Sequence, residues 1–274
     1  MELYKQMYNS LLKVKEKNPL IHHITNYVTA NDCANIVLSL GGSPVMADDV
    51  REVCDMVSIA SALVINIGTL NKKTVESMLL ASKKANELNV PVILDPVGVG
   101  ATKYRTSIAF KLLEEINFSV IRGNISEIKV LSGINTSTKG VDAESQDEFN
   151  SIEERIKLVK VLSERYNTVI AITGKKDVIG FKEEAYIVEN GSYIMAKITG
   201  AGCMCTSVIA SYCGVEKNFL KATLSGVVSM GIAGEIAWEK TKNLGPSSFR
   251  TSLIDSIHNL NENSFNERGK IHNA

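Results

Sequence analysis

The stretch over residues 196–211, AKITGAGCMCTSVIAS, combines small residues with helix-forming ones in an order that suits phosphate binding. Thr199, Gly200, Ala201 and Gly202 allow a sharp turn and a close approach to backbone N–H groups, and helix-forming residues follow. A helix that begins in glycines presents free N–H donors and the positive end of its dipole, which together attract anions. An ordinary turn into a buried helix has the same composition, so this stretch by itself leaves both interpretations open.

Polar residues that end apolar stretches are the second group of chemical candidates. Carboxylates suit a hard cation, a guanidinium suits phosphate, and hydroxyl and amide groups supply hydrogen bonds. Mg²⁺ bound to a nucleoside triphosphate uses this mixture, with one or two carboxylates, waters and phosphate oxygens around the ion. Phosphoryl transfer needs little beyond positioning and charge neutralisation, so such a set is suited to it. The group comprises Asn26, Asn66, Asp95, Arg122, Asn124, Glu127 and Thr173.

Each of these residues also has a structural interpretation. Asp95 precedes a proline and fits the start of a turn, and Arg122 fits a surface ion pair. Asn124 and Glu127 have the spacing of a helix-capping pair, which does not exclude contact with a metal ion. The chemical interpretation therefore depends on whether these residues meet in space.

The usual nucleotide-binding fingerprints are missing. A P-loop needs a serine or threonine after its Gly-Lys pair, but Lys176 follows the Gly-Lys at 174–175. A dinucleotide-binding loop needs a third glycine, which the Gly-Val-Gly run at 98–100 lacks. The sequence therefore indicates neither a Walker-type ATPase nor a dinucleotide-dependent dehydrogenase.

The elements that must position these residues alternate along the chain. Apolar runs predict strands over 63–67, 91–94, 118–122 and 168–172, and helical segments separate them. This alternation is typical of a mostly parallel sheet covered on both faces, in which ligands bind at the carboxyl ends of the strands. The polar residues are therefore expected to converge on one edge of the sheet. No linker or repeat divides the sequence, so one domain over residues 1–274 is expected.

The remaining segments are less regular. Further strands are expected over 21–27 and 43–47, and antiparallel hairpins near 177–181, 184–189 and 192–198, with Asn190-Gly191 as a turn. Residues 132–150 are expected to form a loop, and the polar tail after Asn261 to fray. The expected helices cover 2–17, 49–60, 72–88, 104–117, 125–131, 151–166, 201–214, 216–242 and 247–261, and one more lies between residues 29 and 40.

Charge and composition narrow the class of protein. Lys+Arg and Asp+Glu number 30 each, so no basic field exists to hold nucleic acid, and small-molecule partners are favoured. No apolar run has the length of a membrane span and the N-terminal segment lacks a secretory signal, so no membrane and a cytoplasmic location are expected. The five cysteines are irregularly spaced, which argues against a disulfide framework, and Cys205 and Cys213 are expected in the core.

Taken together, these segments resemble the hydroxyethylthiazole kinase family of thiamine salvage, a branch of the ribokinase-like fold. The resemblance covers almost the whole sequence, and the combination of its motifs is highly specific. It implies a three-layer α/β/α fold with a mostly parallel central sheet. The segments that carry it are Ile24–Val28, Gly42–Ala47, Leu94–Gly98, Arg122–Ile128, Ile172–Gly174, Thr199–Cys203, and Gly245-Pro246 with Ser248-Phe249.

The resemblance implies an ATP-dependent, magnesium-using kinase that phosphorylates the primary alcohol of 4-methyl-5-(2-hydroxyethyl)thiazole. It also implies a homotrimer with the thiazole site near the subunit interface. The residues that it assigns by motif position are Asn26, Met46 and Gly200 for the substrate, Arg122, Thr173 and Gly202 for ATP, and Asp95 and Glu127 for Mg²⁺.

Cys203 departs from the wider ribokinase-like pattern that the resemblance brings in. In that pattern an aspartate that acts as base follows Gly-x-Gly, whereas a cysteine stands there in this family and in this sequence. A thiol has a reference pKa of about 8.5 and a helix N-terminus lowers it, so Cys203 is a candidate catalytic base. A loose transition state needs only weak help from a base, so positioning of the hydroxyl is the alternative role.

Three other functions compete with this one. A sibling kinase acting on a pyrimidine or pyridoxal alcohol is the nearest, and Met46 with Cys203 favours the thiazole over it. A dehydratase of the same fold, which repairs hydrated nicotinamide cofactor, keeps the aspartate, so Cys203 argues against it. A nucleotide-binding regulatory protein without catalysis would release no ADP when the alcohol is added.

Overall fold

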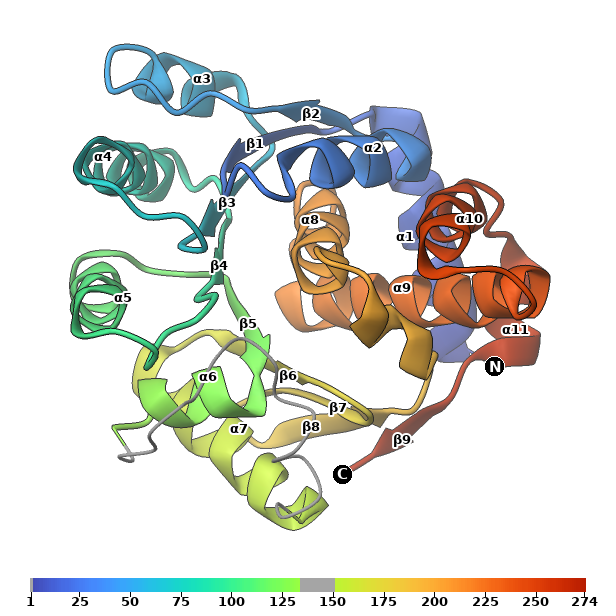
Figure 1. The fold of residues 1–274 in the computed structure, drawn as a ribbon. Helices are drawn as coiled ribbons and strands as arrows, with labels where there is room; N and C mark the ends of the chain where they lie inside the picture. The colour runs from blue at the N-terminus through green and yellow to red at the C-terminus, as the bar shows by residue number, and fades with distance from the viewer. Residues whose placement is uncertain (1, 134–150) are drawn as a thin grey trace.

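A nine-stranded sheet lies at the centre of the computed structural model, which describes residues 2–133 and 151–274 (Figure 1). The strands are β1 Leu20–Ile24, β2 Ser43–Val45, β3 Ala62–Asn66, β4 Val92–Asp95, β5 Val120–Asn124, β6 Val169–Thr173, β7 Asp177–Phe181, β8 Glu184–Val188 and β9 Ile271–Asn273. Their order in the sheet is β2-β1-β3-β4-β5-β6-β7-β8-β9. Neighbours from β2 to β6 are parallel, and those from β6 to β9 are antiparallel. The predicted mostly parallel sheet is confirmed.

The central parallel strands are apolar along most of their length because both of their faces are covered. Every residue of β3 and β4 is buried, including the polar residues Asn66 and Asp95 that end these strands. The register places Asn66 beside Asp95, and Asn124 beside Thr173 on the next pair of strands. Polar groups that end separate segments of the sequence therefore lie at the same edge of the sheet.

One face of the sheet packs against a large helical layer. Val64, Ile93 and Val120 of the sheet belong to the same buried cluster as Tyr212 and Val228 of this layer. Figure 1 shows α8 lying next to the sheet, with α9 behind it. The helices of the layer are α1 Glu2–Lys17, α2 Ala30–Leu40, α8 Ala201–Cys213, α9 Phe219–Thr241, α10 Pro246–His258 and α11 Glu262–Arg268.

The opposite face packs against a second layer of helices. Leu63, Ile65, Leu94 and Ile121 point into this cluster, which is separate from the first. The helices are α3 Val53–Ile59, α4 Lys72–Leu88, α5 Lys103–Glu115, α6 Ile125–Leu131 and α7 Ile152–Tyr166. Two helical layers around one sheet make the three-layer α/β/α arrangement that the sequence predicts.

Among the described residues, one helix, α9, is long and apolar enough to cross a bilayer. However, 72% of its most apolar 18-residue stretch is buried inside the protein. It packs closely on α8 at Gly226, where an added Cβ would lie 2.8 Å from the Cα of Ile209. The absence of a side chain at residue 226 therefore sets the distance between these two helices.

The predicted strand over 192–198 is wrong. Residues Tyr193–Lys197 form a 3₁₀ helix, η2, and Asn190-Gly191 is not a hairpin turn. The Gly191 N–H and the Asn190 side chain both donate to Glu235 of α9, so this segment leaves the sheet and binds a helix. The hairpin that does form joins β7 and β8 at Lys182, whose φ is 54°.

The predicted fraying of the tail after Asn261 is also wrong. Asn261 caps α11 by accepting from the Ser264 N–H, and β9 then pairs with β8 on the sheet edge left free by η2. Phe265 of α11 is fully buried, which anchors this otherwise polar segment. The loop expected over 132–150 lies, from residue 134 onward, outside the described residues.

Candidate active site

The carboxyl ends of the parallel strands bring the predicted polar residues to one edge of the sheet, as expected. Asn66 and Asp95 end β3 and β4, Arg122 lies in β5, and Thr173 ends β6. Asn26 follows β1 and is buried. Helix α8 contacts β1, β3 and β4, and the glycine turn at its N-terminus faces this same group of residues.

Cys203 lies in the first turn of α8 among amide groups. Its Sγ accepts from Nδ2 of Asn66 at 3.3 Å and from Nδ2 of Asn26 at 3.4 Å. The Asn26 amide also donates to Asn66 Oδ1 at 3.0 Å, and the Gly68 N–H donates to the same oxygen at 2.9 Å. The sulfur is therefore held as an acceptor by two side chains that are themselves fixed by hydrogen bonds.

The expectation that a helix N-terminus lowers the pKa of Cys203 is wrong. Burial raises the pKa of the Cys203 thiol to about 11, and the nearby carboxylate of Asp95 adds to the increase. Loss of hydration disfavours the thiolate more than the helix terminus and the amide donors favour it. The thiol is thus protonated near neutral pH, which supports positioning of a hydroxyl over abstraction of its proton.

Asp95 is a fully buried carboxylate, and one of its two oxygens accepts no hydrogen bond. Its Oδ2 accepts from Nδ2 of Asn66 at 2.9 Å and from Oγ1 of Thr206 at 3.0 Å. Its Oδ1 has no hydrogen-bond partner and lies 3.7 Å from Nη1 of Arg122. Burial raises the pKa of Asp95, and the positive charge of Arg122 opposes that rise.

Arg122 places a partly buried positive charge against the glycine turn. Its Nη2 donates to Oγ1 of Thr173, and its Nε has no hydrogen-bond partner. A Cβ added at Gly202 would lie 2.5 Å from Nη1, so only glycine leaves room for the guanidinium at the N-terminus of α8. A guanidinium beside free helix N–H groups is suited to phosphate oxygens.

Glu127 is held by two backbone donors. Its Oε1 accepts from the Gly98 N–H and its Oε2 from the Asn124 N–H, both at 2.9 Å. The Asn124 side chain accepts in turn from the Glu127 N–H, so the predicted capping pair of α6 is confirmed. Burial raises the pKa of Glu127 to about 7, and the negative charge of Asp95 contributes.

These residues fit a magnesium ion. Asp95 and Glu127 are two buried carboxylates whose charges repel, and Asp95 Oδ1 is open. Residues 2–133 and 151–274 contain no group of three or more His, Cys, Asp or Glu side chains that could hold a metal ion, so the protein would supply these two carboxylates only. Mg²⁺ is commonly bound by one or two carboxylates with waters and substrate phosphates, which is the set that this site can offer.

Gly200 and Met46, which were predicted to contact the substrate together with Asn26, lie in different parts of the structure. Gly200 has φ +84°, and a Cβ there would lie 2.9 Å from Cγ2 of Thr29, so glycine is required on both counts. Thr29 donates twice to Asn26 Oδ1, which places Gly200 next to the Asn26 loop. Met46 follows the neighbouring strand β2, is 37% exposed, and takes no part in the hydrogen-bond network.

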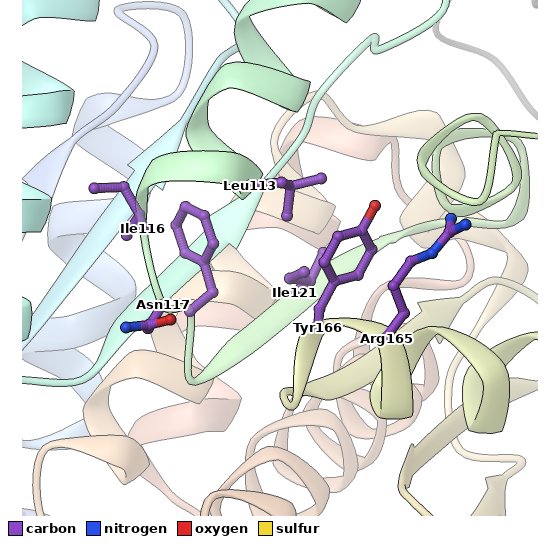
Figure 2. A pocket seen from close by; sticks show the side chains of 7 residues that line it. Leu113, Ile116, Asn117, Ile121, Arg165 and Tyr166 are labelled. Carbon is purple, nitrogen blue, oxygen red and sulfur yellow. The ribbon is translucent and has the colours of Figure 1, made fainter.

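A separate hollow lies at the opposite edge of the sheet, where β5 and β6 begin (Figure 2). Its volume of about 160 Å³ is below the roughly 300 Å³ at which ligand pockets begin. The polar ends of Arg165 and Tyr166 at its rim donate to the backbone carbonyls of Ser132 and Leu131. These groups hold α7 against α6, and the chemical candidates all lie elsewhere.

Comparison with known proteins identifies the family. The model of the hydroxyethylthiazole kinase family matches residues 11–263. A hydroxyethylthiazole kinase from Clostridium tetani is 84% identical over the full length of both chains. The chain belongs to the hydroxyethylthiazole kinase family.

Solved structures agree with the family and the fold. A hydroxyethylthiazole kinase protein from Pyrococcus horikoshii superposes with a TM-score of 0.88 at 37% identity, covering 98% of this chain and 99% of that one. A pyridoxal kinase from Staphylococcus aureus in complex with pyridoxal gives a TM-score of 0.64 at 17% identity, over 93% and 97% of the two chains. At that identity the likeness concerns the fold alone, and the ribokinase-like fold predicted from the sequence is confirmed.

Two residues of this family site received no role from sequence reasoning. Asn66 was expected at the sheet edge as a polar strand end, but its contacts with both Asp95 and Cys203 require the register of three elements. Thr206 lies one turn after Gly202 and binds Asp95. A threonine in an apolar helix has no distinctive sequence signal, because its hydroxyl commonly binds the preceding turn, as it also does here with the Gly202 carbonyl.

Proposed function

We propose that this chain catalyses the ATP-dependent phosphorylation of the primary alcohol of 4-methyl-5-(2-hydroxyethyl)thiazole, in thiamine salvage. The observation that carries the proposal is the cluster at the N-terminus of α8, where buried Asp95 and Cys203 and the partly buried Arg122 meet a glycine turn, in a member of the hydroxyethylthiazole kinase family. Phosphoryl transfer depends on positioning and charge neutralisation, and this cluster is suited to both. We assign the reaction to one domain over residues 1–274 and to the cytoplasm.

The ATP site uses Arg122, Thr173 and Gly202. Thr173 fixes the Arg122 guanidinium, which packs against Gly202 and so lies beside the free N–H groups of α8. The γ-phosphate lies over the amides of residues 200–202 in this proposal. The guanidinium and the helix terminus then stabilise the charge on the transferring phosphoryl group.

The alcohol lies between this loop and the ends of β1 and β2. Asn26, Met46 and Gly200 contact the thiazole, and Cys203 orients its hydroxyl. The two amides on the Cys203 sulfur keep it in one position. Because proton transfer is late in a loose transition state, an orienting group is sufficient there.

Asp95 and Glu127 hold Mg²⁺ in this proposal, directly or through waters. The ion supplies positive charge to phosphate oxygens when it is bound. The Glu127 carboxylate keeps its orientation through the N–H groups of Gly98 and Asn124, and the open oxygen of Asp95 faces the arginine side of the site.

A homotrimer with the substrate site near the subunit interface is part of the proposal. Tyr27 and Val28 stand between Asn26 and Thr29 and are 83% and 57% exposed. Two large exposed side chains beside buried site residues support a subunit contact at this loop. Analytical ultracentrifugation of the purified protein is expected to give about three times the monomer mass, and a monomer would contradict this part.

The test is a panel of alcohols with the purified protein, ATP and Mg²⁺. ADP release and ³¹P NMR of the product are measured with the thiazole, a hydroxymethylpyrimidine and pyridoxal. The highest kcat/KM is expected with the thiazole, and Arg122→Gln should lose most of the activity while remaining folded. Turnover of pyridoxal or the pyrimidine but not of the thiazole would refute the assignment. ADP release that does not depend on any alcohol would refute the kinase itself.

A further inference from the structure

Arg105, in the first turn of α5, donates to three backbone carbonyls that belong to two different loops. Its Nη1 donates to the oxygens of Ile67 and Val97, both at 2.8 Å, and its Nη2 donates to that of Gly68 at 2.7 Å. Ile67 and Gly68 directly follow β3, and Val97 lies just after β4. One guanidinium therefore joins the two loops that leave neighbouring strands at the site edge.

These two loops supply backbone donors to the site. The Gly68 N–H donates to Oδ1 of Asn66, and the Gly98 N–H donates to Oε1 of Glu127, both at 2.9 Å. A shift of either loop would therefore move an amide or a carboxylate of the site. The three hydrogen bonds of Arg105 itself go to main-chain oxygens, so its connection to the reacting groups is indirect.

Neither the helix nor an ion pair explains an arginine at this place. A cation in the first turn of a helix is disfavoured by the helix dipole. Within the described residues, Arg105 forms no ion pair with a carboxylate. The Thr102 cap accepts from the Arg105 N–H at 3.1 Å, so the backbone from which the side chain extends is fixed. The contacts of the guanidinium are with the loops that follow β3 and β4.

We propose that Arg105 is a positioning residue for phosphoryl transfer. It fixes the separation of the loops after β3 and β4, and through them the placement of Asn66, Asp95 and Glu127. The planar fork of arginine reaches both loops at once, whereas lysine is a single point donor and would release one of them. The inference rests on the proposed function, because the transfer step is what this placement serves.

Steady-state kinetics of Arg105→Gln and Arg105→Lys test the proposal. A misplacement of about 1 Å costs roughly 100-fold in rate, so kcat of Arg105→Gln is expected to fall about that much. The KM for the alcohol should change less than about threefold, since Met46 follows β2, which β1 separates from β3, and Asn26 is also held by two hydrogen bonds from Thr29. Arg105→Lys should recover only a small part of kcat. Arg165→Gln, which removes an arginine that binds one carbonyl at the opposite sheet edge, should keep the wild-type kcat.

Amide hydrogen exchange without substrate gives an independent measurement. The Gly68 and Gly98 amides are expected to exchange about tenfold faster in Arg105→Gln and unchanged in Arg165→Gln. Unchanged exchange, or faster exchange with a wild-type kcat, overturns the proposal, and so does an equal loss of kcat in the control. If the wild-type protein phosphorylates another alcohol, the proposed function fails, and the same variants measured with that alcohol still decide the role of Arg105.

Discussion

The raised pKa of Cys203 predicts the effect of replacing it with alanine. With a pKa of about 11, roughly one thiol in a thousand is ionised at pH 8. A general base contributes about 10²–10⁴-fold to a rate, and a population of about 10⁻³ cancels most of that contribution. Cys203→Ala is therefore expected to lower kcat by less than about tenfold, through loss of hydroxyl positioning alone.

The assay is ADP release with saturating alcohol and ATP between pH 6.5 and 9.5. If the thiolate were the base, the wild-type kcat would rise about tenfold per pH unit up to the thiol pKa. We expect no such rise from this group. The absorbance of the thiolate near 240 nm, measured as wild type minus Cys203→Ala, follows the ionisation of this thiol directly. Cys54→Ala in α3 serves as the control, because Cys54 is a partly exposed thiol on the other face of the sheet.

A loss of more than about 10³-fold in Cys203→Ala would refute this reasoning if the wild-type kcat also rose tenfold per pH unit. That pair of results would mean that the thiolate carries the reaction despite its low population. A thiol that titrates near pH 8 would refute the premise instead, since burial would then not dominate its ionisation.

Three further predictions follow from the site. Gly202→Ala brings a Cβ to 2.5 Å from Nη1 of Arg122 and should lower kcat/KM for ATP about 100-fold with little change in Tm, measured by ADP release and calorimetry; unchanged ATP kinetics would contradict the contact. Gly200→Ala places alanine at φ +84° and 2.9 Å from Thr29, so denaturant unfolding should show a loss of about 1–3 kcal/mol. The raised pKa of Glu127, about 7, means that the native state holds a proton that the unfolded state loses above pH 4.5. Without metal, the unfolding free energy of the wild type relative to Glu127→Gln should therefore fall by about 3 kcal/mol from pH 4 to pH 8, and a constant difference would show that the carboxyl is not shifted.

The sequence predicted the sheet and the convergence of the site because buried parallel strands leave a strong signal. Continuous apolar runs such as 62–65 have few alternative structures, and in a parallel sheet the polar residues that follow them share an edge. The cap formed by Asn124 and Glu127 was predictable for a similar reason, since it depends only on residue type and local spacing.

The failed predictions concern features that depend on distant contacts. Asn190-Gly191 has a hairpin sequence, but Glu235 and the pairing of β9 with β8 draw the chain elsewhere. The ionisation of Cys203 was misjudged because burial depends on packing of elements over 100 residues apart, here against Asn66 of β3. Arg105 gives no signal at all in sequence, since its three acceptors are backbone oxygens.

The close packing of α8 on α9 limits the positions at which mutations could change the alcohol substrate of this protein. Ser207 and Ser211 donate to carbonyls of their own helix, and Gly226 of α9 lies in close contact with Ile209 of α8. Larger side chains on α8 therefore have no space between the two helices, next to the glycine turn. Mutations that alter the choice of alcohol are therefore expected among the exposed residues beside the site, at positions such as Tyr27 and Met46. A mutational library aimed at new substrates is best confined to these exposed positions, with the residues between α8 and α9 left unchanged.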